Sequence, residues 1–173
     1  MAIGVMSQYT GKILWRSPDN SAGLGTFRVN GATELRAGYV CTQTDHTHPD
    51  IAKPDGDADI TLGVVLNHPV TALDSDFADD LEVQVALKHS GAGVWVFVDD
   101  NEGALIAGTP MYSTGTDDDG FVETMAVAEV GTAWATAAVQ GFMSKIVHRY
   151  VGITVRAEAD QGSTDVPTRL LLV

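Results

Sequence analysis

Two stretches with the residue pattern of β-strands lie close together near the middle of the chain. Residues 82–88 alternate polar and apolar side chains with a period of two, which indicates a strand with one buried face. Residues 94–98 are apolar on both faces and consist of valine, tryptophan and phenylalanine, which indicates an interior strand. Asp and Gly residues in 99–103 then favour a turn. The pattern predicts a small β-barrel or sandwich with Trp95 at the centre of its core.

The composition supports one all-β domain rather than a helical bundle. The chain has 173 residues, 18 of them glycine, and only 19% of its residues are charged. A chain of this length can bury one good core, and frequent glycines suit a fold with many turns. We therefore predict a single β-barrel domain over residues 31–173, with loop insertions at 45–59 and 126–140, preceded by an extended arm at residues 1–30.

Other segments have strand or hairpin patterns. A polar tip at residues 115–120 is predicted to turn a hairpin whose second arm is 121–125. Residues 126–140 suit a helix and a pair of strands equally well. Further strands, the third of them bent at Gly152, are predicted at residues 33–44, 60–66, 145–158 and 168–173.

A weak internal similarity links two distant pairs of segments. Residues 36–40, around Gly38, precede a strand with Gly63 near its centre, and residues 106–112, around Gly108, precede a strand with Gly152 near its centre. The spacing within the pairs differs, 25 residues (63 − 38) against 44 (152 − 108). The similarity therefore indicates one barrel geometry used twice rather than a regular solenoid.

The N-terminal arm holds apolar side chains that need a surface to cover them. These residues follow neither a helical nor a strand period, and the segment is broken by Pro18 and by glycines. The arm either lies over its own barrel or adds as a strand to a neighbouring sheet. The candidate partner-binding residues are Ile13, Leu14, Trp15 and Phe27.

The loop at residues 45–59 concentrates possible metal ligands. His46 and His48 are two residues apart, as on one face of a strand, and Asp55, Asp57 and Asp59 alternate as in calcium loops. The glycine and terminal glutamate of an EF-hand are missing, and no further histidine motif completes a zinc site. We expect a solvated acidic loop with no metal and no cofactor.

No residue pattern in the sequence indicates catalysis. Ser90 follows His89, but the surrounding KHSGAG sequence predicts a hairpin turn rather than the elbow of a serine hydrolase. Cys41 is the only cysteine, so it is expected to be a buried thiol, and His148 is expected to be an ordinary strand residue. We predict that the protein is not an enzyme.

The net charge and hydropathy pattern limit the possible partners. A net charge of −13 repels nucleic-acid phosphates, so DNA and RNA are not expected partners. The sequence contains no run of eighteen apolar residues and no secretory signal pattern at its start. We expect no membrane partner.

The order of strand motifs resembles that of small β-barrel decoration proteins on tailed-virus capsids. The motifs are LGVVL, EVQVAL, GVWVFV, GALIAGTPMY, a short hairpin, VGITV and a terminal strand, and they cover residues 34–173. The resemblance implies a structural virion protein, assembled in the host cytoplasm, that binds the major capsid protein as a homo-oligomer, commonly a trimer. The N-terminal third is longer than such a barrel needs. A carbohydrate- or receptor-binding module, with Trp134 or Tyr112 as stacking faces, is the alternative.

The acidic residues are mostly short. The chain has 17 Asp and 6 Glu against 4 Lys and 6 Arg. This bias is similar to that of proteins from extreme halophiles, and the resemblance then implies a virus of a haloarchaeon. An acidic protein from an organism of ordinary salinity is the alternative interpretation.

We predict that molar salt stabilises the fold. Salt at about 1 M shortens the Debye length to about 3 Å, which removes most of the repulsion between surface carboxylates. The melting temperature, measured by circular dichroism in dilute buffer and in molar potassium chloride, should rise with salt. A melting temperature that stays level or falls would remove the halophilic interpretation.

Overall fold

The computed structural model shows an all-β protein, which confirms the predicted fold class. It describes the backbone of residues 13–15 together with residues 23–30, 34–44, 48–54, 59–69, 71, 75–99, 103–114, 120–124, 146–157 and 167–173. None of the helices among these residues is long and apolar enough to cross a membrane.

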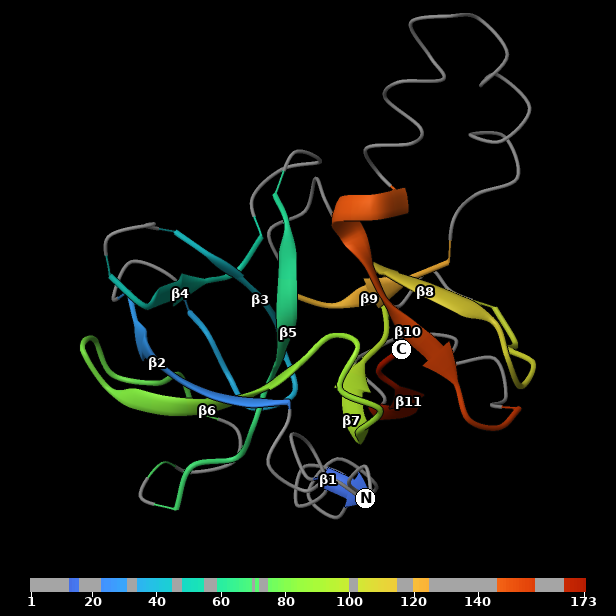
Figure 1. The fold of residues 1–173 in the computed structure, drawn as a ribbon. Coiled ribbons are helices and arrows are strands. Elements are labelled where there is room, and N and C mark those ends of the chain that lie inside the picture. Colours follow the sequence, from blue (N-terminus) through green and yellow to red (C-terminus); the bar gives the residue numbers. More distant parts are fainter. Residues whose placement is uncertain are drawn as a thin grey trace, which may run out of the picture.

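Five strands form a closed barrel in the order β2-β4-β3-β5-β6 (Figure 1). β2 pairs antiparallel with β6 and, at its far end, parallel with β4, which closes the ring. The strands are β2 (Leu24–Val29), β3 (Val40–Gln43), β4 (Asp50–Ala52), β5 (Thr61–Val65) and β6 (Glu82–Leu87).

Six strands form a second sheet in the order β1-β7-β11-β10-β8-β9, which lies beside the barrel in Figure 1. A parallel bridge between Val98 and Val122 brings the β9 edge back to the end of β7, so this sheet curls toward closure. The strands are β1 (Ile13–Trp15), β7 (Gly93–Phe97), β8 (Pro110–Ser113), β9 (Val122–Glu123), β10 (Tyr150–Thr154) and β11 (Pro167–Leu171).

Each sheet has its own hydrophobic core, and the outer face of the barrel contributes to the core of the second sheet. Val29, Cys41 and Val85 belong to the barrel core. The second core combines sheet residues such as Val94 and Leu170 with Val64 and Ala86 from the barrel strands. Apolar burial therefore joins the two sheets as well as filling each of them.

The two central stretches fold as their patterns predict, with one correction. In β6, Val83 and Val85 are buried while Glu82 and Gln84 are exposed, which confirms a strand with one buried face. The expected place of Trp95 is wrong. Its neighbours Val94 and Val96 fill the core, because alternate residues of β7 point to opposite faces, and Trp95 is only half-buried.

Strands occupy two segments that the sequence analysis assigned elsewhere. Residues 24–29, expected in the arm, form β2, and Asp50–Ala52, expected in the acidic loop, forms β4. Both segments are short, six and three residues, so each shows too few alternations of polar and apolar side chains to be recognised as a strand. Residues 126–140, which were left undecided, lie outside the part of the chain that the structure describes.

The expected long strand at residues 145–158 is only partly correct. Residues 146–149 form a helical turn, and the strand begins at Tyr150. The expected irregularity at Gly152 is confirmed, because the register between β10 and β8 shifts between Tyr150 and Gly152. The terminal strand, β11, lies inside the sheet between β7 and β10 rather than at its edge.

The weak internal similarity corresponds to a repeated backbone arrangement. Gly38 and Gly108 both have positive φ, at 87° and 85°, and both start the turn that leads into a strand. The Gly38 N–H donates to the Val65 carbonyl and the Gly108 N–H donates to the Thr154 carbonyl, each at 2.8 Å. These matching contacts make β3 and β8 equivalent, and β5 and β10 equivalent.

The equivalence extends around both sheets. Pairing of Cys41 with Gly63 matches pairing of Met111 with Gly152. The remaining pairings match in the same way, with β2, β4 and β6 taking the places of β7, β9 and β11. The matched pairs are Val65–Val85 and Thr154–Leu170, Arg28–Glu82 and Phe97–Pro167, Gln43–Ile51 and Ser113–Val122, and Val29–Ile51 and Val98–Val122. The chain thus builds one five-stranded unit twice.

We predict that Gly63→Ala and Gly152→Ala destabilise the fold while Gly103→Ala does not. A Cβ atom would lie 2.1 Å from the Ala86 carbonyl oxygen at Gly63 and 2.3 Å from the Leu171 carbonyl oxygen at Gly152. Backbone must shift at both sites, which costs about 1–3 kcal/mol in a packed core. Nothing lies within 4 Å of a Cβ at Gly103.

Urea unfolding of the three variants checks this prediction. Equal stability of Gly63→Ala and Gly103→Ala would show that β5 and β6 are not in close contact.

Candidate functional site

The candidate partner-binding residues lie in two different strands. Ile13, Leu14 and Trp15 form β1, which pairs antiparallel with β7 of the same chain at Val94 and Gly93. The described part of the arm therefore pairs as a strand with its own chain, whereas the expectation was that it lies over its own barrel or adds as a strand to a neighbouring subunit or partner sheet.

Phe27, the fourth candidate, belongs to the barrel rather than to the arm. Its side chain is half-buried and packs against the barrel core. The Phe27 ring lies over Gly25, so a Cβ at Gly25 would come within 2.3 Å of Phe27 Cε2. Phe27 thus fills the space that a larger residue at position 25 would take, and it is not placed beside β1 by any described contact.

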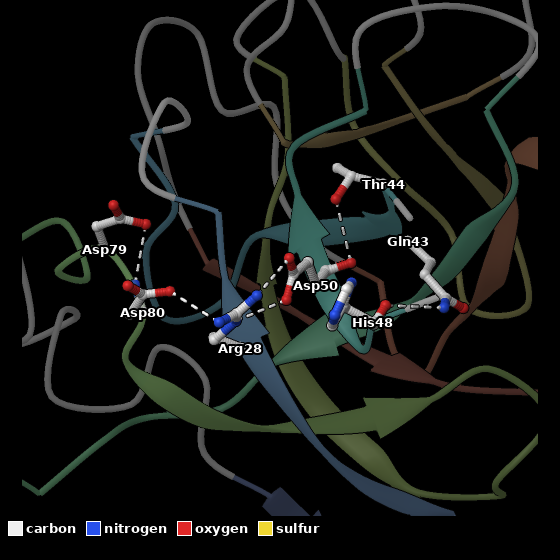
Figure 2. Close-up of polar contacts among 7 residues, drawn as sticks. All are labelled: Arg28, Gln43, Thr44, His48, Asp50, Asp79 and Asp80. Atoms are coloured by element: carbon white, nitrogen blue, oxygen red, sulfur yellow. Dashed lines mark hydrogen bonds and ion pairs between the residues drawn. The ribbon is translucent and has the colours of Figure 1, made fainter. Parts of the chain in front are cut away.

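The candidate metal ligands are not brought together in the described residues. His48 is exposed and Asp59 is half-buried, while His46, Asp55 and Asp57 lie outside the described residues. The His48 carbonyl accepts a hydrogen bond from Gln43 Nε2 at 3.4 Å, beside the start of β4 (Figure 2). Within the described ranges, no group of three His, Cys, Asp or Glu side chains has the geometry to hold a metal ion.

The clearest polar cluster surrounds Arg28 at the joint between β2 and β4 (Figure 2). Arg28 donates from Nε to Asp50 Oδ1 at 2.7 Å and from Nη2 to Asp50 Oδ2 at 2.9 Å. Arg28 Nη1 also lies 3.2 Å from Asp80 Oδ1. The Asp50 hydrogen bond, followed by its negative charge, raises the pKa of Arg28. This cluster links both paired strands, β2 and β4, to the turn at Asp80.

A second polar cluster lies in the other unit, where β8 pairs with β9. Arg149 is buried, donates from Nε to the Ser113 carbonyl at 2.6 Å and forms an ion pair with Glu123. Beside it, the Ser113 and Thr61 hydroxyl groups are 3.0 Å apart and share a hydrogen bond. Arg149 therefore ties β8 and β9 together from its position just before β10.

A mixed polar and apolar pocket of about 630 Å³ lies at the ends of β3, β5 and β6. Burial lowers the pKa of Lys88, which lies on its wall. Ile60 stands at the position just before β5 that Arg149 takes before β10, and it is 57% exposed. The pocket is therefore lined by an exposed isoleucine at the position where the second unit has the buried Arg149. Its lining residues are Thr42, Gln43, Thr44, Asp59, Ile60, Thr61, Leu62, Leu87, Lys88 and His89.

His89 and Ser90 are held as parts of a turn. His89 is exposed and adopts a positive φ of 65°, and Ser90 Oγ accepts a hydrogen bond from the Ala92 N–H at 3.2 Å. The serine oxygen therefore caps the turn before β7. The predicted hairpin at KHSGAG is wrong, because β6 belongs to the barrel and β7 to the six-stranded sheet, so this turn connects the two sheets.

The remaining residues singled out from the sequence have structural surroundings. Cys41 is a buried thiol as predicted; its Sγ donates to the Gly63 carbonyl at 3.6 Å, and burial raises the pKa of the thiol. Tyr112 is half-buried with its ring edge-on to Tyr150, and Trp134 lies outside the described residues. His148 is in the helical turn before β10, not in a strand.

Sequence reasoning missed the Arg28 and Arg149 clusters because each joins residues far apart in the chain. Arg28 and Asp50 are 22 residues apart, and Arg149 and Glu123 are 26 apart. In each case the sequence shows a lone arginine within an apolar segment. Such an arginine needs a polar or charged partner when its segment is buried. Comparison with models of known protein families and with curated proteins found no match.

We predict that Arg149→Met destabilises the protein by about 2–3 kcal/mol, because it leaves buried groups without their charged partner. The Arg149 side chain is 6% exposed, against 41% for Arg28. Arg28→Met is the matched control, and it should destabilise the protein clearly less because solvent screens its pairs. Urea unfolding measures both values, and an Arg149→Met cost no larger than that of the control would contradict a structural role for the buried pair.

Proposed function

We propose that the protein is a structural virion protein that binds the outside of a capsid shell and stabilises it as a homo-oligomer. The observation that carries the proposal is the position of β1, a short N-terminal strand at the end of the six-stranded sheet. A strand in this position presents backbone N–H and C=O groups that another polypeptide can pair with. Recognition of this kind needs no catalytic group and no cofactor.

The polar clusters support a binding role over turnover. Arg28 connects β2, β4 and the turn at Asp80, and Arg149 connects β8 and β9. Both arginines are occupied in holding strands together rather than pointing as a pair into the pocket. A rigid body that resists deformation is what a shell-stabilising protein requires.

The partner on this proposal is the major capsid protein, with further copies of the same chain as neighbours, commonly as a trimer. Many copies on a regular lattice turn weak single contacts into lasting attachment. In concentrated salt, apolar burial and backbone pairing lose less strength than exposed ion pairs do. The net charge of −13 also argues against a nucleic-acid partner inside the shell.

The carbohydrate- or receptor-binding alternative receives less support from the described residues. Tyr112 would have to offer its ring face to a sugar, but the ring is half-buried and in contact with Tyr150. Burial also raises the pKa of Tyr112, as expected for a hydroxyl that is partly removed from water.

Deleting residues 1–15 should abolish attachment to the shell while the remaining chain stays folded. The deletion removes β1 but keeps β2, whereas a deletion extended to residue 30 would remove a barrel strand. The measurement is co-sedimentation with purified capsids, with circular dichroism to verify folding. Ile106→Ser is the control, because Ile106 is 72% exposed and lies in the turn before β8, away from β1. Undiminished co-sedimentation of the truncated protein would refute the role of β1.

A further inference from the structure

Two strand edges that have no pairing partner among the described residues lie in β2 and in β1. One belongs to the first half of β2, at residues 24–26, since β4 pairs only with Arg28 and Val29. The other belongs to β1, which ends the six-stranded sheet and pairs only with β7. Each is three residues long.

The hydrogen bonds of β2 show which backbone groups face its open edge. The Leu87 N–H donates to the Gly23 carbonyl and the Val29 N–H donates to the Leu81 carbonyl, so odd-numbered residues face β6. The Arg28 N–H donates to the Pro49 carbonyl on the opposite side. By the two-residue alternation of a strand, the N–H and C=O groups of Leu24 and Thr26 point away from β6, toward the open edge.

The repeated fold shows what this edge can hold. Leu24 and Ala86 pair as Gly93 and Leu171 do, so Leu24 is equivalent to Gly93, and Thr26 is equivalent to Trp95. In the second unit this edge is partly covered, because β1 pairs with Gly93 and Val94, the equivalents of Leu24 and Gly25. The same edge in the first unit carries no strand in the described part of the chain.

We propose that the open edge of β2 at residues 24–26 pairs with the outer edge of β1 from a second copy of this chain. In this arrangement β1 lies between two equivalent edges, β7 of its own chain and β2 of the neighbour. Its contribution to shell attachment is then to build the oligomer that presents many copies to the lattice, not to pair directly with the shell. No strand has to leave its place in the free protein, so the pairing costs little reorganisation. The proposal deepens the self-association part of the proposed function and does not depend on the identity of the shell.

The side chains at the open edge of β2, residues 24–26, are compatible with a neighbouring strand. Leu24 is half-buried, Thr26 is exposed and Gly25 has no side chain, so no charge has to be desolvated at these three positions. The open edge ends at Arg28, where β4 pairs with β2 and Arg28 forms its ion pair with Asp50. None of these three residues carries a carboxylate that would repel another copy of a chain with a net charge of −13.

The contact joins different surfaces on the two copies, β1 of one and β2 of the other. Such a head-to-tail contact produces a closed ring or an open filament according to the rotation between copies. A closed ring would give the cyclic homo-oligomer that the proposed function calls for, and each copy would give one strand edge and receive one.

Amide hydrogen exchange on the unmodified full chain tests the proposal directly. At high protein concentration the amides of Leu24 and Thr26 should be protected, and on dilution below the association range they should exchange rapidly. Gly25 and Phe27 are the internal controls, since their amides face β6 and should stay protected at both concentrations. Leu24 and Thr26 amides that exchange equally fast in the oligomer, or a chain that stays monomeric, would overturn the proposal.

Thr26→Pro removes the one N–H that position 26 directs to the open edge while leaving the bonds to β6. Sedimentation velocity should show that the dissociation constant of self-association rises roughly tenfold or more, as expected for the loss of about one hydrogen bond and of the strand geometry. Thr26→Val, which keeps the N–H and favours strands, should associate like the unmodified protein.

Circular dichroism verifies that Thr26→Pro remains folded, and a folded proline variant that still associates normally would contradict the proposal. If the proline variant unfolds, the hydrogen-exchange result decides. Shell co-sedimentation is measured separately. A monomeric protein that still binds shells would refute this inference but not the proposed shell binding. An oligomer with protected Leu24 and Thr26 amides that does not bind shells would refute the shell binding but not this inference.

Discussion

The fold depends on a short parallel pairing that returns each five-stranded unit to its first strand. In the first unit β2 meets β4 at Arg28–Asp50 and Val29–Ile51, and in the second the equivalent contact is Val98–Val122. Every other pairing in the two units is antiparallel. Without this joint, each unit would be an open sheet with two exposed edges, and its core would lose one wall.

The two units strengthen the same joint with different chemistry. Arg28 and Asp50 form a bidentate ion pair beside the first joint. At the equivalent positions, Phe97 and Phe121 place their rings 5.6 Å apart, and Tyr39 packs edge-on against both. The first joint faces water, where a charged pair is tolerated, whereas the second contacts Tyr39 of the other unit and is suited to apolar burial.

The repeat left its mark in the sequence mainly at glycines, and physical constraints explain why. Gly38 and Gly108 need positive φ, and Gly63 and Gly152 approach a neighbouring carbonyl too closely for a Cβ atom. A side chain at most other positions has only to be apolar and of suitable volume, so Val85 in one unit can correspond to Leu170 in the other. The all-β class and the strands near 61–65, 82–87 and 93–97 could therefore be predicted from local pattern.

Features that depend on distant partners could not be predicted in this way. β4 has only three residues, and its strand state follows from β2 and β3 on either side of it. Arg149 stands alone in an apolar segment, but this signal does not identify Glu123 as its partner, because the sequence does not show that β8 and β9 meet beside it. Trp95 was misplaced because a strand with apolar residues on both faces does not reveal which face is inside.

Among the described residues, β1 pairs with the second unit and no equivalent strand pairs with the first, which breaks the symmetry of the repeat. Two equal units with equal edges would favour contacts between identical surfaces, which end at a dimer. Because β1 covers the β7 edge and leaves the equivalent β2 edge open, the chain has one surface that offers a strand and a different one that lacks it. If the open β2 edge receives β1 of a neighbouring copy as proposed, two unlike surfaces meet and the contact runs head to tail.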